Sequence, residues 1–128
     1  MVDAVDTTTG QIAWKFEIPQ PNKSGFAVAG DLVFYGENNG LFHALDATTG
    51  ATLWTFDGTS VENGGGSAAG PAAYVVNGKE FIVNAFGGNR IDRDLVAVDT
   101  LVGDALIAFG LPEAEYTGPN VVYGSTAD

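Results

Sequence analysis

Residues 44–54 read A-L-D-A-T-T-G-A-T-L-W, and residues 4–14 read A-V-D-T-T-T-G-Q-I-A-W. Both fit one pattern, A-x-D-x-T-T-G-x-x-x-W. In each stretch an alternating segment ends at an aspartate, whose side chain can accept hydrogen bonds from the amides of a turn. The glycine can take a positive φ without steric cost, and a second alternating segment follows it. The pattern therefore predicts a β-hairpin with a tryptophan at a fixed place on its second strand.

This pattern recurs along the chain. The two tryptophans, Trp14 and Trp54, are about 40 residues apart, which fits the roughly 40–45 residues of a four-stranded propeller blade. A weaker copy, A-V-D-T-L-V-G-D-A-L-I, begins at Ala97 and has Ile107 in place of the tryptophan. Because this copy lies farther from the second than the second lies from the first, we expect an insertion in its blade, in the Gly-rich stretch 63–70.

Short apolar runs separated by turn residues divide the rest of the chain, which predicts four antiparallel strands in each blade. The strands expected for the first complete blade are Phe26–Ala29, Leu32–Gly36, Leu41–Asp46 and Thr52–Phe56. The strands expected for the next blade are Ala72–Val76, Glu80–Ala85, Leu95–Asp99 and Ala105–Phe109. Asn77-Gly78 between two apolar runs is a strong hairpin signal.

The predicted fold class is therefore all-β: a partial β-propeller of about two and a half four-stranded antiparallel blades. Residues 1–112 would form the propeller part, and residues 113–128 a C-terminal tail that is mostly loop, with one short strand around Val121–Tyr123. The expected divisions of the propeller part are a half blade (1–18), a full blade (22–58) and a full blade with an insertion (59–112).

Composition limits the classes of function. The 128 residues include 5 Lys and Arg against 16 Asp and Glu, a net charge of −11. Nucleic acids and anionic membrane surfaces require clustered basic side chains, so neither is an expected partner. There is no cysteine, which excludes disulfides and thiolate metal sites. No apolar run approaches the length of a membrane-spanning helix, so membrane insertion is not expected.

Three other stretches have weak functional signals. Gly64–Ala69 fits the G-x-G-x-x-A spacing of a dinucleotide fingerprint, but Pro71 and a strand follow where a helix is needed, which indicates a flexible insertion. His43 is the one histidine and lies in a strand pattern without a catalytic or metal-binding motif, which indicates a structural or surface role. Asp92-Arg93-Asp94 lacks the spacing of a calcium loop and indicates a solvated turn.

The pattern A-x-D-x-x-x-G-x-x-x-W resembles the tryptophan-docking motif of quinoprotein dehydrogenases, eight-bladed propellers that carry pyrroloquinoline quinone (PQQ). Three further stretches are similar to the C-terminal blades of PQQ-dependent alcohol dehydrogenases: K-F-E-I-P-Q-P-N (15–22), A-G-D-L-V-F-Y-G (29–36) and G-P-A-A-Y-V-V-N-G-K-E-F-I-V (70–83). The resemblance covers residues 2–112.

The resemblance implies roles for individual residues. Each motif tryptophan would pack between its own blade and the next, and the small alanine would let the neighbouring blade come close. The implied docking positions are Ala4, Asp6, Gly10, Trp14, Ala44, Asp46, Gly50, Trp54, Ala97, Asp99 and Gly103. Asn22, Lys23 and Ser24 would lie near the central face that holds the cofactor, where Lys23 could pair with a carboxylate of the quinone. In the family a Trp-Gly-Gly stretch follows P-x-P-N, and Lys23 replaces that tryptophan.

The resemblance also implies an activity. The parent protein would be a periplasmic oxidoreductase, a PQQ-dependent alcohol dehydrogenase that uses PQQ and calcium to oxidise a small alcohol. The family's adjacent-cysteine disulfide, catalytic aspartate and calcium ligands belong to earlier blades. We therefore expect no catalytic or metal-ligating residue in this chain, and neither PQQ binding nor activity from the chain alone. Its partners would be the remaining blades of the parent propeller, and its open ends are expected to cause self-association.

Two other functions stay open. Periplasmic scaffold proteins of outer-membrane assembly share the tryptophan-docking repeat but bind proteins rather than cofactors. Lys23 in place of the tryptophan favours such a scaffold, whereas the Pro-x-Pro-Asn flank favours the enzyme. The chain could also be a relic or gene fragment without activity, which its beginning halfway through a blade favours.

Overall fold

The computed structural model describes residues 1–19, 22–88, 102–111 and 122–124, and nearly all of the regular secondary structure in them is β-strand. The strands are β1 (Val2–Val5), β2 (Ile12–Phe16), β3 (Ala27–Ala29), β4 (Leu32–Gly36), β5 (Leu41–Asp46), β6 (Thr52–Asp57), β7 (Ala72–Val76), β8 (Lys79–Phe86), β9 (Ala105–Gly110) and β10 (Val122–Gly124). One short 3-10 turn, η1 (Gly58–Ser60), follows β6. Among the described residues, no helix has the length and apolar character needed to cross a membrane.

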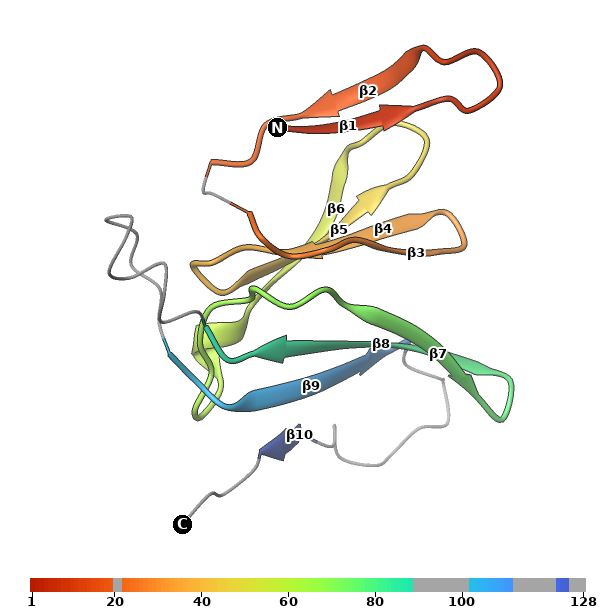
Figure 1. Ribbon diagram of the computed structural model, residues 1–128. Coiled ribbons are helices and arrows are strands. Elements are labelled where there is room, and N and C mark those ends of the chain that lie inside the picture. Colours follow the sequence, from red (N-terminus) through yellow and green to blue (C-terminus); the bar gives the residue numbers. More distant parts are fainter. Residues whose placement is uncertain (20–21, 89–101, 112–121, 125–128) are drawn as a thin grey trace.

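The strands form three antiparallel sheets that follow one another in chain order. The first hairpin pairs β1 with β2, the middle sheet has the order β3-β4-β5-β6, and the last sheet has the order β10-β9-β8-β7. Figure 1 shows the three sheets as successive layers, with the first hairpin over one face of the middle sheet and the last sheet under the other. This succession of blade-like sheets confirms the prediction of a partial β-propeller.

Alternation along β4 and β5 buries the middle sheet on both faces. Phe34, Phe42 and Ala44 belong to the core shared with the last sheet. Tyr35 points the other way and meets Phe16 of the first hairpin, with ring centroids 5.9 Å apart. Phe42 and Tyr35 are both fully buried. A sheet covered on both sides is what an interior blade requires.

Aromatic side chains fill the space between the middle and last sheets. The ring of Phe42 lies 5.4 Å from that of Phe109 on β9 and 6.0 Å from that of Phe86 on β8. Phe56 on β6 completes the cluster, 5.0 Å from Phe109. Offset and edge-to-face ring contacts of this kind add to the free energy of burying the rings, so this interface is the main core of the chain.

The last sheet contains β7, β8, β9 and β10. β8 pairs directly with β9, with Asn84 opposite Ile107. The segment Leu95–Asp99 itself lies outside the described residues. β10 pairs with the other edge of β9, so the short strand expected near Val121 joins the sheet. Apolar alternation predicts that a segment is a strand but not which strand becomes its neighbour.

The insertion of the last blade was expected in the Gly-rich stretch 63–70. This stretch is packed: Gly65, Gly66 and Ser67 are buried. A Cβ added to Gly36 would overlap the side chain of Ser67, so this segment lies tightly against the end of β4. The expectation of a flexible insertion at Gly64–Ala69 is therefore wrong.

Candidate functional site

The turn between β5 and β6 is held by Asp46. Its Oδ1 accepts hydrogen bonds from the amides of Thr48 and Thr49, each at 2.8 Å, and its carbonyl oxygen accepts one from the amide of Gly50. The amides of Thr49 and Thr48 hold the pKa of the Asp46 carboxyl below its usual value. The turn at residues 6–10 has the same bonds, and both glycines have φ near +70°, at 71° and 73°. The predicted turn chemistry of both motifs is confirmed.

The two hairpins also share their register. Ala4 lies opposite Trp14, and Ala44 lies opposite Trp54. In both hairpins the register shifts directly after the alanine, which marks the same irregularity in each ladder. The sequence repeat is therefore a structural repeat, in which a small residue stands across from a large one.

Trp14 links the first hairpin to the middle sheet. Its indole nitrogen donates a hydrogen bond to the carbonyl oxygen of Ala47 at 2.8 Å. Its ring lies against Gly50, where an added Cβ would come within 2.7 Å of the ring carbons. The second motif thus provides both the acceptor and the space for the tryptophan of the first.

Trp54 has a different environment. Its ring makes an edge-to-face contact with Phe109 of the last sheet at 5.2 Å and stacks on Phe56 at 6.0 Å. The residue is nevertheless 40% exposed, so the described residues cover its ring only in part, and its docking role stays a prediction.

The weak third copy does not repeat the geometry of the first two. Gly103 precedes β9, its amide donates to the carbonyl oxygen of Gly87 at 3.0 Å, and it is not among the glycines with positive φ. Ile107 is buried in the middle of β9. Ala97 and Asp99 lie outside the described residues, so their docking role stays a prediction.

Asn22, Lys23 and Ser24 form the bend that leads into β3. The Ser24 hydroxyl is buried, 2.8 Å from the carbonyl oxygen of Gly25 and 3.0 Å from that of Ala69. The Asn22 side-chain oxygen accepts a hydrogen bond from the Ser24 amide at 2.6 Å, while Lys23 is exposed. The bend is therefore held both by its own hydrogen bonds and by the contacts of Ser24 with Ala69 and Gly36.

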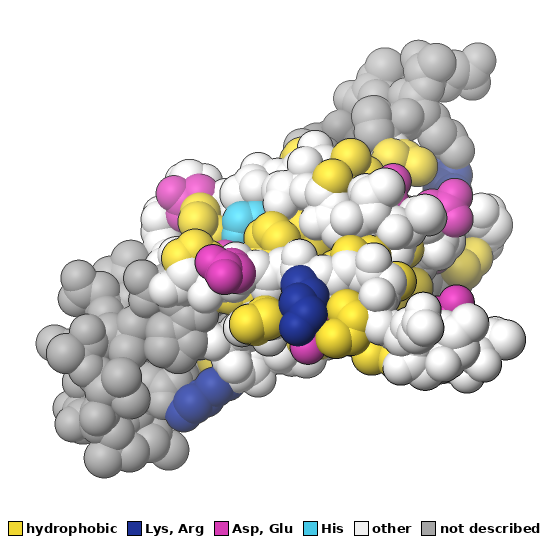
Figure 2. All heavy atoms as spheres, turned by 90° about the horizontal axis from the view of Figure 1, so that it is seen from above, with side chains coloured by type: hydrophobic (Ala, Val, Ile, Leu, Met, Phe, Trp, Pro, Cys, Tyr) yellow, Lys and Arg dark blue, Asp and Glu magenta, His cyan; other side chains and the backbone are white. Residues whose placement is uncertain are grey.

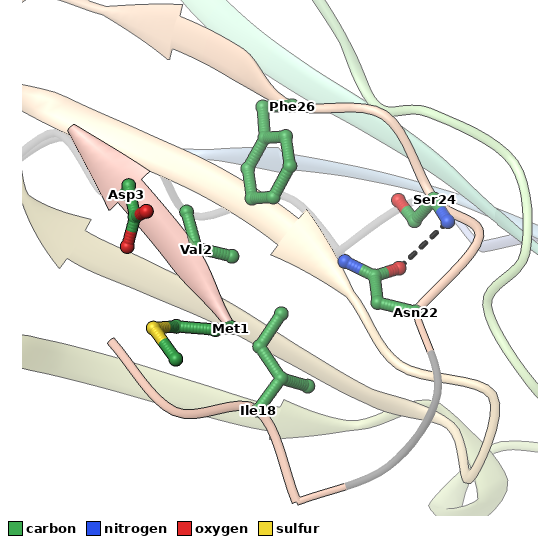
Figure 3. A pocket seen from close by; sticks show the side chains of 7 residues that line it. All are labelled: Met1, Val2, Asp3, Ile18, Asn22, Ser24 and Phe26. Atoms are coloured by element: carbon green, nitrogen blue, oxygen red, sulfur yellow. Dashed lines mark hydrogen bonds between the residues drawn. The ribbon is translucent and has the colours of Figure 1, made fainter. Parts of the chain in front are cut away.

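A hollow of about 460 Å³, open to solvent, lies beside this bend. Figure 3 shows the end of β1 on one side of it and Asn22 and Ser24 on the other. The lining residues are Met1, Val2, Asp3, Ile18, Asn22, Ser24 and Phe26. More of the surface that lines this hollow is polar than apolar.

These residues do not make a complete site for a quinone. A planar quinone with several carboxylates needs flat apolar surfaces on its two faces and donors for its acidic groups. The Ser24 hydroxyl already faces two carbonyl oxygens, and the lining of the hollow includes the Asp3 carboxylate, which would repel an acidic ligand. Within the described residues, no group of three or more acidic, His or Cys side chains could hold a metal ion. A cofactor-facing role for Asn22, Lys23 and Ser24 stays a prediction and requires other blades.

The structure contains a buried polar cluster around Glu37 that the sequence analysis did not predict. Glu37 is 2% exposed; its Oε1 lies 3.0 Å from Nε2 of His43 and 3.4 Å from the hydroxyl of Tyr35. Asn39 donates to Oε2 at 3.1 Å, and His43 Nδ1 lies 2.9 Å from Oγ1 of Thr55. Burial, and next the charge of Glu37, raise the pKa of Tyr35. Both ring nitrogens of His43 lie within hydrogen-bond distance of a partner, Glu37 or Thr55. The histidine therefore has a structural role inside the middle sheet.

Comparison with known families gives one match over most of the chain. The family model PQQ_2, described as outer membrane protein assembly factor BamB, matches residues 1–108. The chain belongs to the PQQ_2 family. A comparison with curated protein sequences gave no significant match.

Solved structures similar to this PQQ_2 chain include two dehydrogenases. One is the quinohemoprotein alcohol dehydrogenase of Comamonas testosteroni, with a TM-score of 0.54 and 31% identity over 66% of this chain. The other is the quinohemoprotein alcohol dehydrogenase ADHIIG of Pseudomonas putida HK5, with a TM-score of 0.55 and the same identity and coverage. The chain covers 12% of each enzyme. The expected relation to PQQ-dependent alcohol dehydrogenases is therefore confirmed at the level of the propeller fold and family.

Proposed function

We propose that this chain supplies structural blades to a PQQ-dependent dehydrogenase that oxidises alcohols, with at most part of the surface that faces the cofactor. The support is the 31% identity to two quinohemoprotein alcohol dehydrogenases across 66% of the chain. Because the chain spans 12% of each enzyme, oxidation of the alcohol would depend on residues outside it. PQQ, with calcium, would accept electrons from a small alcohol in the complete protein, which would work in the periplasm.

The role proposed for the chain's own residues is to place neighbouring blades. Trp14 would act as a docking residue, since it bonds to Ala47 and packs on Gly50 of the next sheet. Trp54 would dock in the same way onto the blade that follows. Lys23, exposed at the bend before β3, would be the residue of this bend that pairs with a carboxylate of the quinone.

A second candidate is a scaffold that binds proteins rather than cofactors. The matching family model carries the description of an outer-membrane assembly factor, and Lys23 stands where an aromatic side chain near the quinone would be expected. In that case the blades would serve only as a rigid binding surface.

A chimera separates the two functions. The segment of the Comamonas testosteroni enzyme that aligns with this chain is replaced by the chain's own residues, and the purified chimera is assayed for bound PQQ and for alcohol-dependent dye reduction. We expect both to be retained, and Lys23→Ala to weaken PQQ retention while Lys15→Ala, also exposed, leaves it unchanged. A folded chimera without PQQ would contradict the dehydrogenase and favour the scaffold.

A titration of the isolated chain tests whether oxidation depends on residues outside it, as proposed, or whether the chain binds PQQ by itself. PQQ is titrated with calcium into the 128-residue protein while the fluorescence of Trp14 and Trp54 is followed. We expect no saturable change at micromolar PQQ, because the described residues provide no complete site. Saturable binding would show that this chain holds a cofactor site of its own.

A further inference from the structure

Asparagine followed by glycine occurs three times in the chain, at Asn39-Gly40, Asn63-Gly64 and Asn77-Gly78. In such a pair the backbone nitrogen of the glycine can attack the side-chain carbonyl carbon of the asparagine and close a five-membered ring. Glycine favours this attack because it has no side chain to keep the two atoms apart. Ring closure also requires that the asparagine side chain and the following amide are free to move, so the surroundings of each pair determine whether it reacts.

The pair Asn39-Gly40 is held by several hydrogen bonds. The Asn39 side chain donates one to Glu37 at 3.1 Å and accepts one from the amide of Leu41 at 3.0 Å. The Gly40 amide, which would be the attacking group, is buried and donates to the carbonyl oxygen of Glu37 at 3.0 Å. Ring closure at this pair would therefore break three hydrogen bonds.

The pair Asn63-Gly64 is held through its backbone. The Gly64 amide donates to the carbonyl oxygen of Val61 at 3.1 Å, and the carbonyl oxygen of Asn63 accepts a hydrogen bond from the amide of Asp104 at 2.8 Å. A Cβ added to Gly64 would overlap the carbonyl oxygen of Gly58, so the backbone has little room to turn. The exposed Asn63 side chain is thus next to a nitrogen that cannot easily reach it.

The pair Asn77-Gly78 has no such restraint. It forms the two-residue turn between β7 and β8, with positive φ at both positions, 50° and 77°. Both residues are exposed, and within the described part of the chain neither the Asn77 side chain nor the Gly78 amide makes a hydrogen bond. A Cβ added to Gly78 would meet nothing within 4 Å, and Figure 1 shows the turn projecting from the end of the last sheet.

We propose that Asn77 is a site of spontaneous covalent modification, selected by the fold from the three pairs. The nitrogen of Gly78 bonds to Cγ of Asn77, and the side-chain nitrogen leaves as ammonia with the proton of the Gly78 amide. Water then opens the ring at either carbonyl carbon and leaves aspartate or isoaspartate at position 77. Water is the only co-reactant, and no atom changes its oxidation state.

The modification would change the charge of the protein and the geometry of the turn. A carboxylate replaces a neutral amide in a chain that already has 16 Asp and Glu against 5 Lys and Arg. Basic side chains are scattered over the face drawn in Figure 2, so none of its regions is strongly positive. The product should therefore bind an anion exchanger more tightly than the original chain. Isoaspartate also lengthens the backbone of a two-residue turn that fixes Val76 opposite Lys79.

The test is incubation of the full folded chain at low salt in mildly alkaline buffer, which promotes attack by the backbone nitrogen. Peptide mapping by mass spectrometry follows each Asn-Gly pair, and fragmentation that separates aspartate from isoaspartate identifies the product. We expect Asn77 to react at least about tenfold faster than Asn39 or Asn63, the factor that two or three hydrogen bonds of ordinary strength would give. In guanidinium chloride, which removes those hydrogen bonds, the three rates should become similar.

Two matched variants complete the test. Asn77→Gly should abolish the more acidic product and keep the turn, because glycine also adopts positive φ. Asn63→Gly, at the other asparagine with positive φ (59°), is the control and should leave the reaction of Asn77 unchanged. An unmodified Asn77 in the folded chain, an equal or faster reaction at Asn39 or Asn63, or an equally large difference between the pairs in guanidinium chloride would each overturn the inference.

Discussion

The indole nitrogen of Trp14 lies 2.8 Å from the carbonyl oxygen of Ala47, and this hydrogen bond ties the first hairpin to the turn of the next sheet. The same ring covers Gly50, which has no side chain to displace it. A hydrogen bond at the rim of a ring and close packing beneath it fix both the distance and the orientation of two successive sheets. The contact explains why the repeat requires its glycine as well as its tryptophan.

Gly50→Ala and Gly10→Ala form a matched pair that measures this contact. Both glycines have nearly the same positive φ, 73° and 71°, so each alanine should cost about 1–2 kcal/mol in backbone strain. At Gly50 the added Cβ would also press into the Trp14 ring, whereas at Gly10 it would meet nothing within 4 Å. We expect Gly50→Ala to lower the free energy of unfolding by about 1–3 kcal/mol more than Gly10→Ala, measured by urea unfolding. Equal losses would mean that Trp14 does not pack on Gly50 in solution.

Trp54→Ala should destabilise the protein less than a fully buried aromatic would. With 40% of the side chain exposed, we expect a loss of about 1–3 kcal/mol. Phe42→Ala removes a fully buried ring from the core between the middle and last sheets and should cost about 3–5 kcal/mol. Thermal and urea unfolding of the two variants give the comparison. A larger loss for Trp54→Ala than for Phe42→Ala would place Trp54 in a buried blade interface.

Glu37→Ala should be among the most damaging single substitutions. It would leave His43, Tyr35 and Asn39 without their shared acceptor inside the protein, which we expect to cost about 3–5 kcal/mol. Glu37→Gln keeps one acceptor oxygen and should cost less. Glu62→Ala, at an exposed position, is the control and should change stability by less than about 0.5 kcal/mol. A Glu37→Ala protein as stable as the control would show that the cluster adds nothing to the fold.

The isolated chain should self-associate more as salt is added. The outer face of the last sheet exposes apolar side chains, among them Val76 (47%) and Leu106 (49%), while the net charge of −11 keeps copies apart at low ionic strength. Salt at about 0.15 M shortens the reach of that repulsion to about 8 Å and leaves the apolar attraction in place. Size-exclusion chromatography with light scattering should show larger species at that salt, and Leu106→Lys should reduce them. A cooperatively unfolding monomer at both salt concentrations would contradict this prediction.

Much of the fold could be predicted from local pattern. The turns at Asp6 and Asp46 form as expected, because an aspartate and a glycine at fixed spacing determine turn geometry within a few residues. The strands Leu32–Gly36, Leu41–Asp46 and Ala72–Val76 have the expected bounds, since alternation is a property of the segment itself. The expected site residues could be placed only in part: Asn22, Lys23 and Ser24 lie together at one bend, and their relation to a cofactor depends on other blades.

The sequence by itself determined the all-β class, the repeat and the hairpins, because each is set by residues close together in the chain. The tertiary structure alone decided that β9 lies beside β8, that Trp54 stays partly exposed and that Glu37 gathers Tyr35, Asn39 and His43 in the interior. These outcomes depend on which strands become neighbours and on how two sheets pack face to face. Alternation gives every strand one apolar face, and only the packed sheets show which partner covers it.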